Sequence, residues 1–188
     1  MMRMFALAAV TAGLLLSGCG GSTSGAGHDS MTTAPAGASF NDADVTFAQS
    51  MIPHHRQAVQ MAALADGRAA RAEVKTLAGK IKAAQQPEID TMNGWLTAWG
   101  RPTDMSGMGM TMPGMMTDAD MKKLMNAKGA GFDKQFLTMM ISHHEGAIAM
   151  AQQEAAQGTN ADAVALAKKV VTDQRAEIAK MRQMLADS

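Results

Sequence analysis

Hydrophobic residues recur along most of the chain with the spacing of an amphipathic α-helix, and no stretch alternates with the two-residue period of a strand. Capping residues and glycines place the expected helices at about residues 42–66, 69–99, 132–157 and 161–186. Asn41 is a favourable N-cap for the first of these, and Gly100 and Gly158 are expected stops. Pro53 and Pro87 fall inside helical patterns, so each should kink or break its helix.

The second half of the chain repeats the first with an offset of 89 residues and no gap. The matched pairs of the first helix in each half are Asp44 and Asp133, Phe47 and Phe136, Met51 and Met140, His54 and His143, His55 and His144, Ala58 and Ala147, and Met61 and Met150. The same register continues through the second helix of each half. A duplicated helical hairpin is therefore predicted, with repeat one at 44–99 and repeat two at 133–188.

Residues 101–131 join the two hairpins and are long enough to run the length of a helical bundle. The predicted fold is all-α: a ferritin-like four-helix bundle built from two duplicated αα-hairpins with a long Met-rich crossover. A simple up-and-down bundle with an elaborate loop is the alternative, because the length permits a crossover without requiring one. A short helix is expected after Thr117, with Met121 and Met125 in the core.

The N-terminal residues resemble an export signal rather than part of the fold. A basic start and a short apolar run lead to Leu16-Ser17-Gly18-Cys19, which is similar to a bacterial lipoprotein signal. Residues 1–18 are thus predicted to be a lipoprotein signal peptide, with Cys19 as the lipidated residue. Residues 19–40 are expected to be a flexible Gly- and Ser-rich tether, and residues 41–188 the helical bundle. An ordinary secretory signal with an incidental cysteine, or a buried helix, is the alternative.

Composition narrows the function classes. The net charge is zero and aromatic residues are 4% of the chain. The chain therefore lacks both the excess of basic residues that would neutralise phosphates and the aromatic side chains that would stack on bases, which argues against nucleic-acid binding. A single cysteine excludes an intrachain disulfide and a cysteine-based zinc site. Methionine is abundant, with 20 residues in 188, which exceeds the need for core filler.

Both histidine pairs lie on the inward face of their helices, beside methionines in the same register. The predicted metal ligands are His54, His55, His143, His144, Met51, Met140, Met61 and Met150. Glu88 and Glu177, with Gln85 and Gln174, lie on the inward face of the second helices and are expected to hydrogen-bond the ligating histidines. The alternative is a buried hydrogen-bond network without metal. An ordinary imidazole pKa of about 6.5 would make metal binding weaken between about pH 7.5 and 5.

The mixture of imidazole and thioether favours copper, with silver as its chemical mimic. A second, thioether site is predicted on the crossover, where glycines and prolines make a continuous helix implausible; its residues are Met105, Met108, Met110, Met112, Met115 and Met116. Packing of these methionines on the bundle is the alternative. A di-iron site of the ferritin kind requires Glu-x-x-His on two helices. The first helix lacks this motif, which argues against an iron oxidase.

The doubled motif resembles a known family. Met51-Ile52-Pro53-His54-His55 with Met61-Ala62, and Met140-Ile141-Ser142-His143-His144-Glu145-Gly146-Ala147 with Met150-Ala151, are similar to the signature of the secreted bacterial DUF305 proteins. Ser142 stands where the family usually has proline, and Arg56-Gln57 where it usually has an acidic residue and glycine. The resemblance implies a ferritin-like bundle in the cell envelope, and for some members a link to copper.

These patterns predict a cell-envelope lipoprotein that binds copper, as Cu(I) and also Cu(II) or Ag(I), for sequestration, buffering or delivery. Its expected partners are copper ions, the membrane through the lipid anchor and other envelope copper proteins, with no nucleic acid. It is expected to be exported and to face the periplasm or the cell exterior. A ferritin-like di-metal oxidoreductase and a helical interaction module without metal are the two alternatives, so enzymatic activity stays open.

Overall fold

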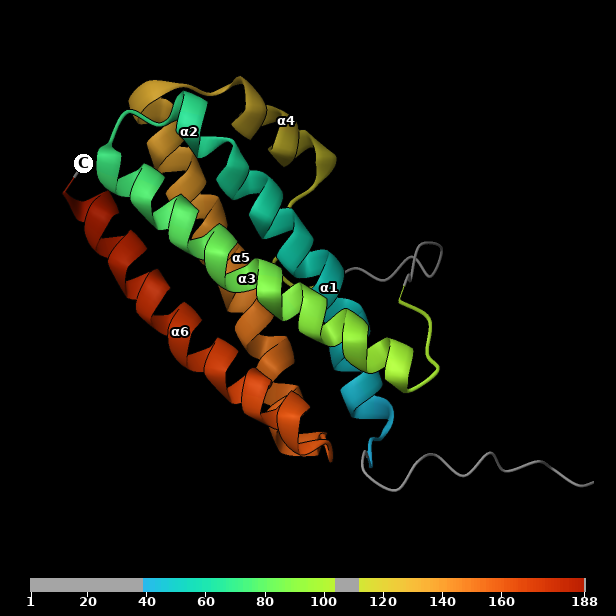
Figure 1. The fold of residues 1–188 in the computed structure, drawn as a ribbon. Helices are drawn as coiled ribbons and strands as arrows, with labels where there is room; N and C mark the ends of the chain where they lie inside the picture. Colours follow the sequence, from blue (N-terminus) through green and yellow to red (C-terminus); the bar gives the residue numbers. More distant parts are fainter. Residues whose placement is uncertain (1–38, 104–111, 188) are drawn as a thin grey trace, which may run out of the picture. The chain divides into compact units, whose positions relative to one another are not determined.

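The computed structural model describes residues 39–103 and 112–187, which are helical apart from their connections (Figure 1). The helices are α1 (Asp42–Ala63), α2 (Ala65–Arg68), α3 (Ala72–Ala98), α4 (Asp118–Asn126), α5 (Gly129–Gln157) and α6 (Ala161–Ala186). The four long helices run side by side, with α1 packed on α3 and α5, and α5 packed on α6. Extended pairing in the described part of the chain is limited to an isolated bridge between Ala69 and Gly129, which confirms the all-helical prediction.

Helix boundaries follow local capping chemistry. The Asn41 side chain accepts hydrogen bonds from the backbone of Ala43 and Asp44, and the Asp44 carboxylate accepts one from the Asn41 backbone. Thr117 and Asp120 form the same reciprocal cap at α4, which confirms the short helix after Thr117. Gly100 ends the α3 region with a φ of 64°.

Two expected helix limits are wrong, and the two prolines do not interrupt their helices. Pro53 and Pro87 break neither helix, because α1 and α3 continue through them. The first helix ends at Ala63 rather than near residue 66, and the short α2 follows it. α5 begins at Gly129, whose φ of 61° suits glycine, rather than near residue 132. Proline lacks one backbone donor, and tertiary packing outweighs that loss in these helices.

The buried side chains form two apolar clusters. One contains Met61, Met140, Phe132 and Phe136, and the other contains Met51 with residues of α3, α5 and α6. The inward face predicted for the first helix is confirmed, since Asp44, Phe47, His54, His55, Ala58 and Met61 are buried. Among the described residues, none of the helices combines the length and apolarity needed to cross a membrane.

Matching aspartates attach each hairpin to the turn of the other. Asp44 accepts hydrogen bonds from the backbone of Thr159 and Asn160 before α6, at 3.0 to 3.2 Å. Asp133, its counterpart 89 residues later, accepts bonds from the backbone of Ala70 and Arg71 before α3, at 3.1 and 3.0 Å. These bonds satisfy backbone donors that a helix N-terminus leaves free.

The described end of the crossover lies across α1 and α5, and we call residues 112–116 the strap. The Gln57 side chain holds it through two bonds to the backbone of Met116, at 2.9 and 2.7 Å. On the α5 side, Gly114 and Gly146 bring the two backbones into close contact, since a Cβ added at Gly114 would lie 2.6 Å from the Ser142 carbonyl oxygen. The strap is therefore fixed to both helices.

Candidate metal centre between the two hairpins

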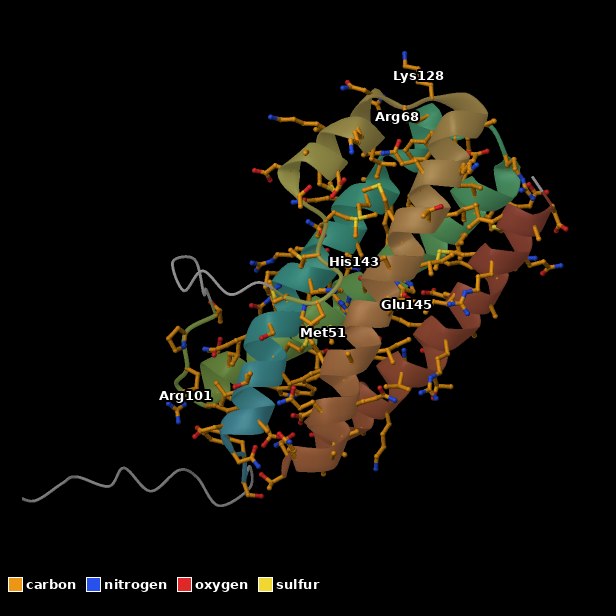
Figure 2. All side chains as sticks on the ribbon, turned by 180° about the vertical axis from the view of Figure 1, so that it is seen from behind. Met51, Arg68, Arg101, Lys128, His143 and Glu145 are labelled. Atoms are coloured by element: carbon orange, nitrogen blue, oxygen red, sulfur yellow. The ribbon has the colours of Figure 1, made fainter. Side chains whose placement is uncertain are left out.

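His54 and His143 meet where α1 packs on α5. Their ring centroids are 3.8 Å apart with an interplanar angle of 39°, and both side chains are buried. Figure 2 shows His143 and Met51 in the middle of the molecule, whereas Arg68, Arg101 and Lys128 lie toward its ends. The repeat brings equivalent positions of the two hairpins into contact, which the sequence offset alone did not predict.

The neighbouring histidines turn toward the second helix of their own hairpin. His55 Nε2 donates to Glu88 Oε2 at 2.9 Å, and His144 Nε2 donates to Glu177 Oε2 at 2.6 Å. Glu88 also accepts a bond from Lys169 Nζ at 3.0 Å. The expected contact between each inward glutamate and a histidine is present, while a role around a metal stays a prediction.

Five buried ring nitrogens have no hydrogen-bond partner in the described part of the chain. They are Nδ1 of His54, His55 and His144, and both nitrogens of His143. His54 Nε2 donates to the Pro113 carbonyl oxygen at 3.0 Å. A buried nitrogen without a partner costs stability, so five of them on four neighbouring rings are unusual in a protein interior. Gln85 and Gln174 are also buried, each with an unpartnered Oε1.

Burial keeps the central histidines neutral. Burial, with smaller repulsion from His55 and His144, lowers the pKa of His54 to about 4 although the Pro113 bond opposes the shift. Burial also holds the pKa of His143 well below its usual value, with repulsion from the other three histidines adding to it. The premise of an ordinary imidazole pKa is therefore wrong for this pair, and both rings keep free lone pairs well below neutral pH.

The predicted methionine ligands are divided among different surroundings. Met51 lies in one apolar cluster, whereas Met61 and Met140 lie in the other. Met150 is partly buried and lines a groove between α1 and α5. No three His, Cys, Asp or Glu side chains of residues 39–103 and 112–187 converge as a ligand set, so a metal between the histidines would need thioether ligands or water.

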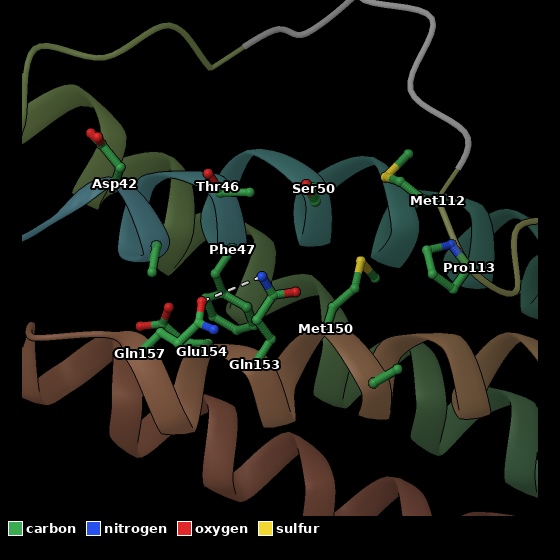
Figure 3. A pocket seen from close by; sticks show the side chains of 12 residues that line it. Asp42, Thr46, Phe47, Ser50, Met112, Pro113, Met150, Gln153, Glu154 and Gln157 are labelled. Atoms are coloured by element: carbon green, nitrogen blue, oxygen red, sulfur yellow. Dashed lines mark hydrogen bonds between the residues drawn. The ribbon is translucent and has the colours of Figure 1, made fainter.

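The groove has a volume of about 460 Å³ and extends along α1 and α5 to the strap. Met112 and Met150 line it near Pro113, and Glu154 and Gln157 lie toward the other end (Figure 3). Pro113 lines one end of the groove and its carbonyl oxygen bonds His54, whereas the buried rings of His54 and His143 do not line the groove themselves.

The crossover methionines are only partly described. Met105, Met108 and Met110 lie outside the described residues, as does Cys19. Met112, Met115 and Met116 are half-buried, and Met116 packs on the apolar cluster of Met61. Met121 also packs there, but Met125 is 41% exposed, so its expected core position is wrong. The short α4 buries Leu124 instead.

Sequence reasoning missed a buried carboxyl pair at the far end of the groove. Burial, together with the adjacent Asp44 carboxylate, raises the pKa of Glu154 to about 8, so it keeps a proton at neutral pH and can donate it to Asp44. Glu154 is 1% exposed. The position equivalent to it in repeat one is Ala65, and this substitution was the available signal.

Comparison with known proteins gives the family. The chain matches the domain of unknown function DUF305 over residues 44–185. Among solved structures, a DUF305 protein from Streptomyces coelicolor is 38% identical, with a TM-score of 0.72 over 77% of this chain and 93% of its own. A DUF305 fragment from Deinococcus radiodurans is 31% identical, with a TM-score of 0.71 over 79% and 98%.

A third similar structure is that of CopM in its Cu(I)-bound form. It is 30% identical, with a TM-score of 0.67 over 77% of this chain and 96% of CopM. CopM has also been solved bound to Cu(II), bound to silver and in the apo form. The search of curated proteins finds no match. The match over residues 44–185 and the shared fold establish that this chain belongs to the DUF305 family.

Proposed function

We propose that the protein is a lipid-anchored copper-binding protein of the cell envelope, which sequesters, buffers or delivers the metal. The observation that carries the proposal is the set of five buried ring nitrogens of His54, His55, His143 and His144 that have no hydrogen-bond partner among the described residues. Neutral imidazole nitrogen is a good ligand for copper, and a buried lone pair has no other evident use here.

Each histidine has a defined role in this proposal. His54 and His143 are the central ligands, because their rings are in contact and His54 bonds the carbonyl of Pro113, which lines the groove. His55 and His144 each keep Nδ1 without a partner among the described residues, since Glu88 and Glu177 accept the hydrogen on Nε2 and orient the rings, but they do not converge with the central pair into one ligand set there. Met112 and Met150 line the groove with Pro113 and are the candidates for thioether ligands there, and thioethers favour Cu(I).

Similarity supports the choice of copper. CopM shares about 30% of its residues with this chain and binds Cu(I), Cu(II) and silver. Silver follows Cu(I) in its preference for soft ligands, which matches the methionine content of this chain. Export agrees with the family, which includes a Streptomyces coelicolor protein classed among secreted proteins.

We also infer that the fold is a ferritin-like bundle of two duplicated hairpins. Two pairs of contacts at equivalent positions support this origin: Asp44 and Asp133 each bond the turn of the other hairpin, and His55–Glu88 repeats as His144–Glu177. A gene duplication explains both pairs with one event.

Metal analysis tests the function. The full-length chain should be exported, purified without added metal and assayed for bound ions, then titrated with Cu(I) against a competing chelator. Copper in the isolated protein supports the proposal, iron or manganese supports the oxidoreductase, and no metal supports the interaction module.

A variant with alanine at His54, His55, His143 and His144 should lose at least one tightly held copper ion while keeping its helical circular dichroism. His28→Ala is the matched control, because His28 is the remaining histidine and belongs to the expected tether. Equal copper affinity in the quadruple variant and the control would exclude the histidine site.

A further inference from the structure

The bond between His54 and Pro113 determines which nitrogen of His54 is free. A carbonyl oxygen only accepts, so His54 Nε2 carries the hydrogen and Nδ1 carries the lone pair. Nδ1 is buried and has no partner in the described part of the chain. His143, the equivalent residue, has no bond at either nitrogen there. The two rings are therefore held differently although the repeat makes them equivalent.

The two rings differ because the single strap makes different contacts with α1 and with α5. Gln57 and Gly146 are equivalent positions, separated by the same 89 residues, yet they contact the strap in opposite ways. The Gln57 side-chain amide forms two hydrogen bonds with the Met116 backbone, whereas Gly146 has no side chain and so leaves space for Pro113 and Gly114. A Cβ at Gly146 would overlap the Pro113 carbonyl group. The long side chain on α1 and the missing one on α5 together place that carbonyl over His54.

We propose that the strap is a positioning element for His54. Gln57 and Gly146 hold the Pro113 carbonyl oxygen on Nε2–H, so that a soft cation binds at Nδ1 while the hydrogen bond between Nε2 and Pro113 stays intact. The inference rests on the proposed function for the identity of the cation, while the hydrogen bond itself belongs to the metal-free protein. Fixing one ring by a hydrogen bond on its far nitrogen lowers the rearrangement needed when the metal binds. The unfixed His143 then adapts to the ion.

The test uses the metal-free, full-length chain labelled with ¹⁵N and observes the ring N–H groups by NMR. In wild type, the His54 hydrogen should reside on Nε2 and exchange slowly with water. In Gly146→Ala, which must displace the strap, that exchange should accelerate about tenfold or more, as for loss of one buried hydrogen bond. The Nε2–H signals of His55 and His144 should not change. Gly131→Ala is the matched control, because it lies in the same helix and its added Cβ meets nothing within 4 Å.

Gln57→Leu is the second variant, since it removes both bonds to Met116 without adding bulk at α5. Hydrogen on Nδ1 of wild-type His54, or unchanged exchange in both variants, would overturn the positioning role. Addition of Ag(I) then separates the two proposals. A shift confined to Nδ1 of His54 with Nε2–H retained supports both, and a shift at Nε2 overturns the strap alone. Slow Nε2–H exchange with no response of any histidine to Ag(I) or Cu(I) supports the strap and contradicts the metal function.

Discussion

His143 and His144 are adjacent in the chain but meet opposite conditions. Among residues 39–103 and 112–187, neither nitrogen of His143 has a hydrogen-bond partner, whereas His144 donates to Glu177 at 2.6 Å. In the metal-free protein, His143→Leu should raise the free energy of unfolding by about 1 kcal/mol, because it removes two buried groups without partners. His144→Leu should lower it by about 1–3 kcal/mol, since Glu177 loses its partner. Urea unfolding measures both changes, and equal effects of the two substitutions would contradict this division of roles.

The depressed pKa of His54 sets the pH range of metal binding. Because that pKa is about 4, protons should not compete for the central pair until the pH approaches this value. Cu(I) affinity of the histidine site should therefore change less than about threefold between pH 7.5 and 5, whereas a site with ordinary imidazoles would lose about tenfold for each pH unit below 6.5. Chelator competition at three pH values measures this. A steady tenfold loss per unit would show that the rings titrate normally.

The lowered pKa of His54 also makes the stability of the metal-free protein depend on pH. A histidine whose folded pKa is lowered binds its proton more readily in the unfolded chain, so stability is lost as the pH falls from about 6.5 toward 4. His143, whose pKa is also depressed by burial, adds to this loss. Copper binding should counteract the effect, because the bound metal favours the folded state.

At the scale of elements, Glu154 couples the start of α1 to the end of α5. Its pKa of about 8 means that the folded chain keeps a proton that the unfolded chain releases, so this carboxyl costs stability progressively as the pH rises from about 4.5 to 8. Glu154→Gln can still donate to Asp44 but does not titrate. The variant should be more stable than wild type by about 1–3 kcal/mol at pH 8.5, and close to it at pH 5.

Unfolding in urea at both pH values checks this. Glu145→Gln is the control, since Glu145 lies on the same helix but is exposed and bonds Arg182 at 2.8 Å. A difference between Glu154→Gln and wild type that does not depend on pH would show that Glu154 is ionised in the folded protein.

The crossover is the element whose thioethers are proposed to collect Cu(I). Replacing Met105, Met108, Met110, Met112, Met115 and Met116 by leucine keeps bulk and removes sulfur, so the number of bound Cu(I) ions should fall by at least one without unfolding. Met125→Leu is the control, because Met125 is an exposed thioether on α4. Because Met116 packs on the core, its leucine should be tolerated. An unchanged Cu(I) capacity would assign these residues to packing.

For the whole molecule, the expected lipid anchor decides where the domain acts. Cys19→Ala removes the proposed acyl acceptor, so the precursor should accumulate uncleaved or be processed wrongly. Fractionation with and without detergent, followed by mass analysis of the N-terminus, measures this. Recovery of the wild-type protein entirely in the detergent-free soluble fraction would contradict the anchor.

Much of the architecture was predictable from the sequence because it depends on short-range chemistry. Helical periodicity, the caps at Asn41 and Thr117 and the inward face of the first helix involve residues within a few positions of one another. The repeat added the equivalence of the two histidine pairs, and the pairing of each inward glutamate with a histidine followed from burial.

The tertiary structure alone decided how these parts meet. His54 contacts His143, and the Pro113 carbonyl bonds His54 across 59 positions of sequence. Asp44 reaches Asn160 across 116 positions, and the methionines of one predicted ligand set are divided between two clusters. Periodicity states which face of a helix is buried but not which helix covers it, and a single crossover can lie over only one of two equivalent sites. The sequence therefore determined the helices and their inward chemistry, while packing determined which lone pairs stay free.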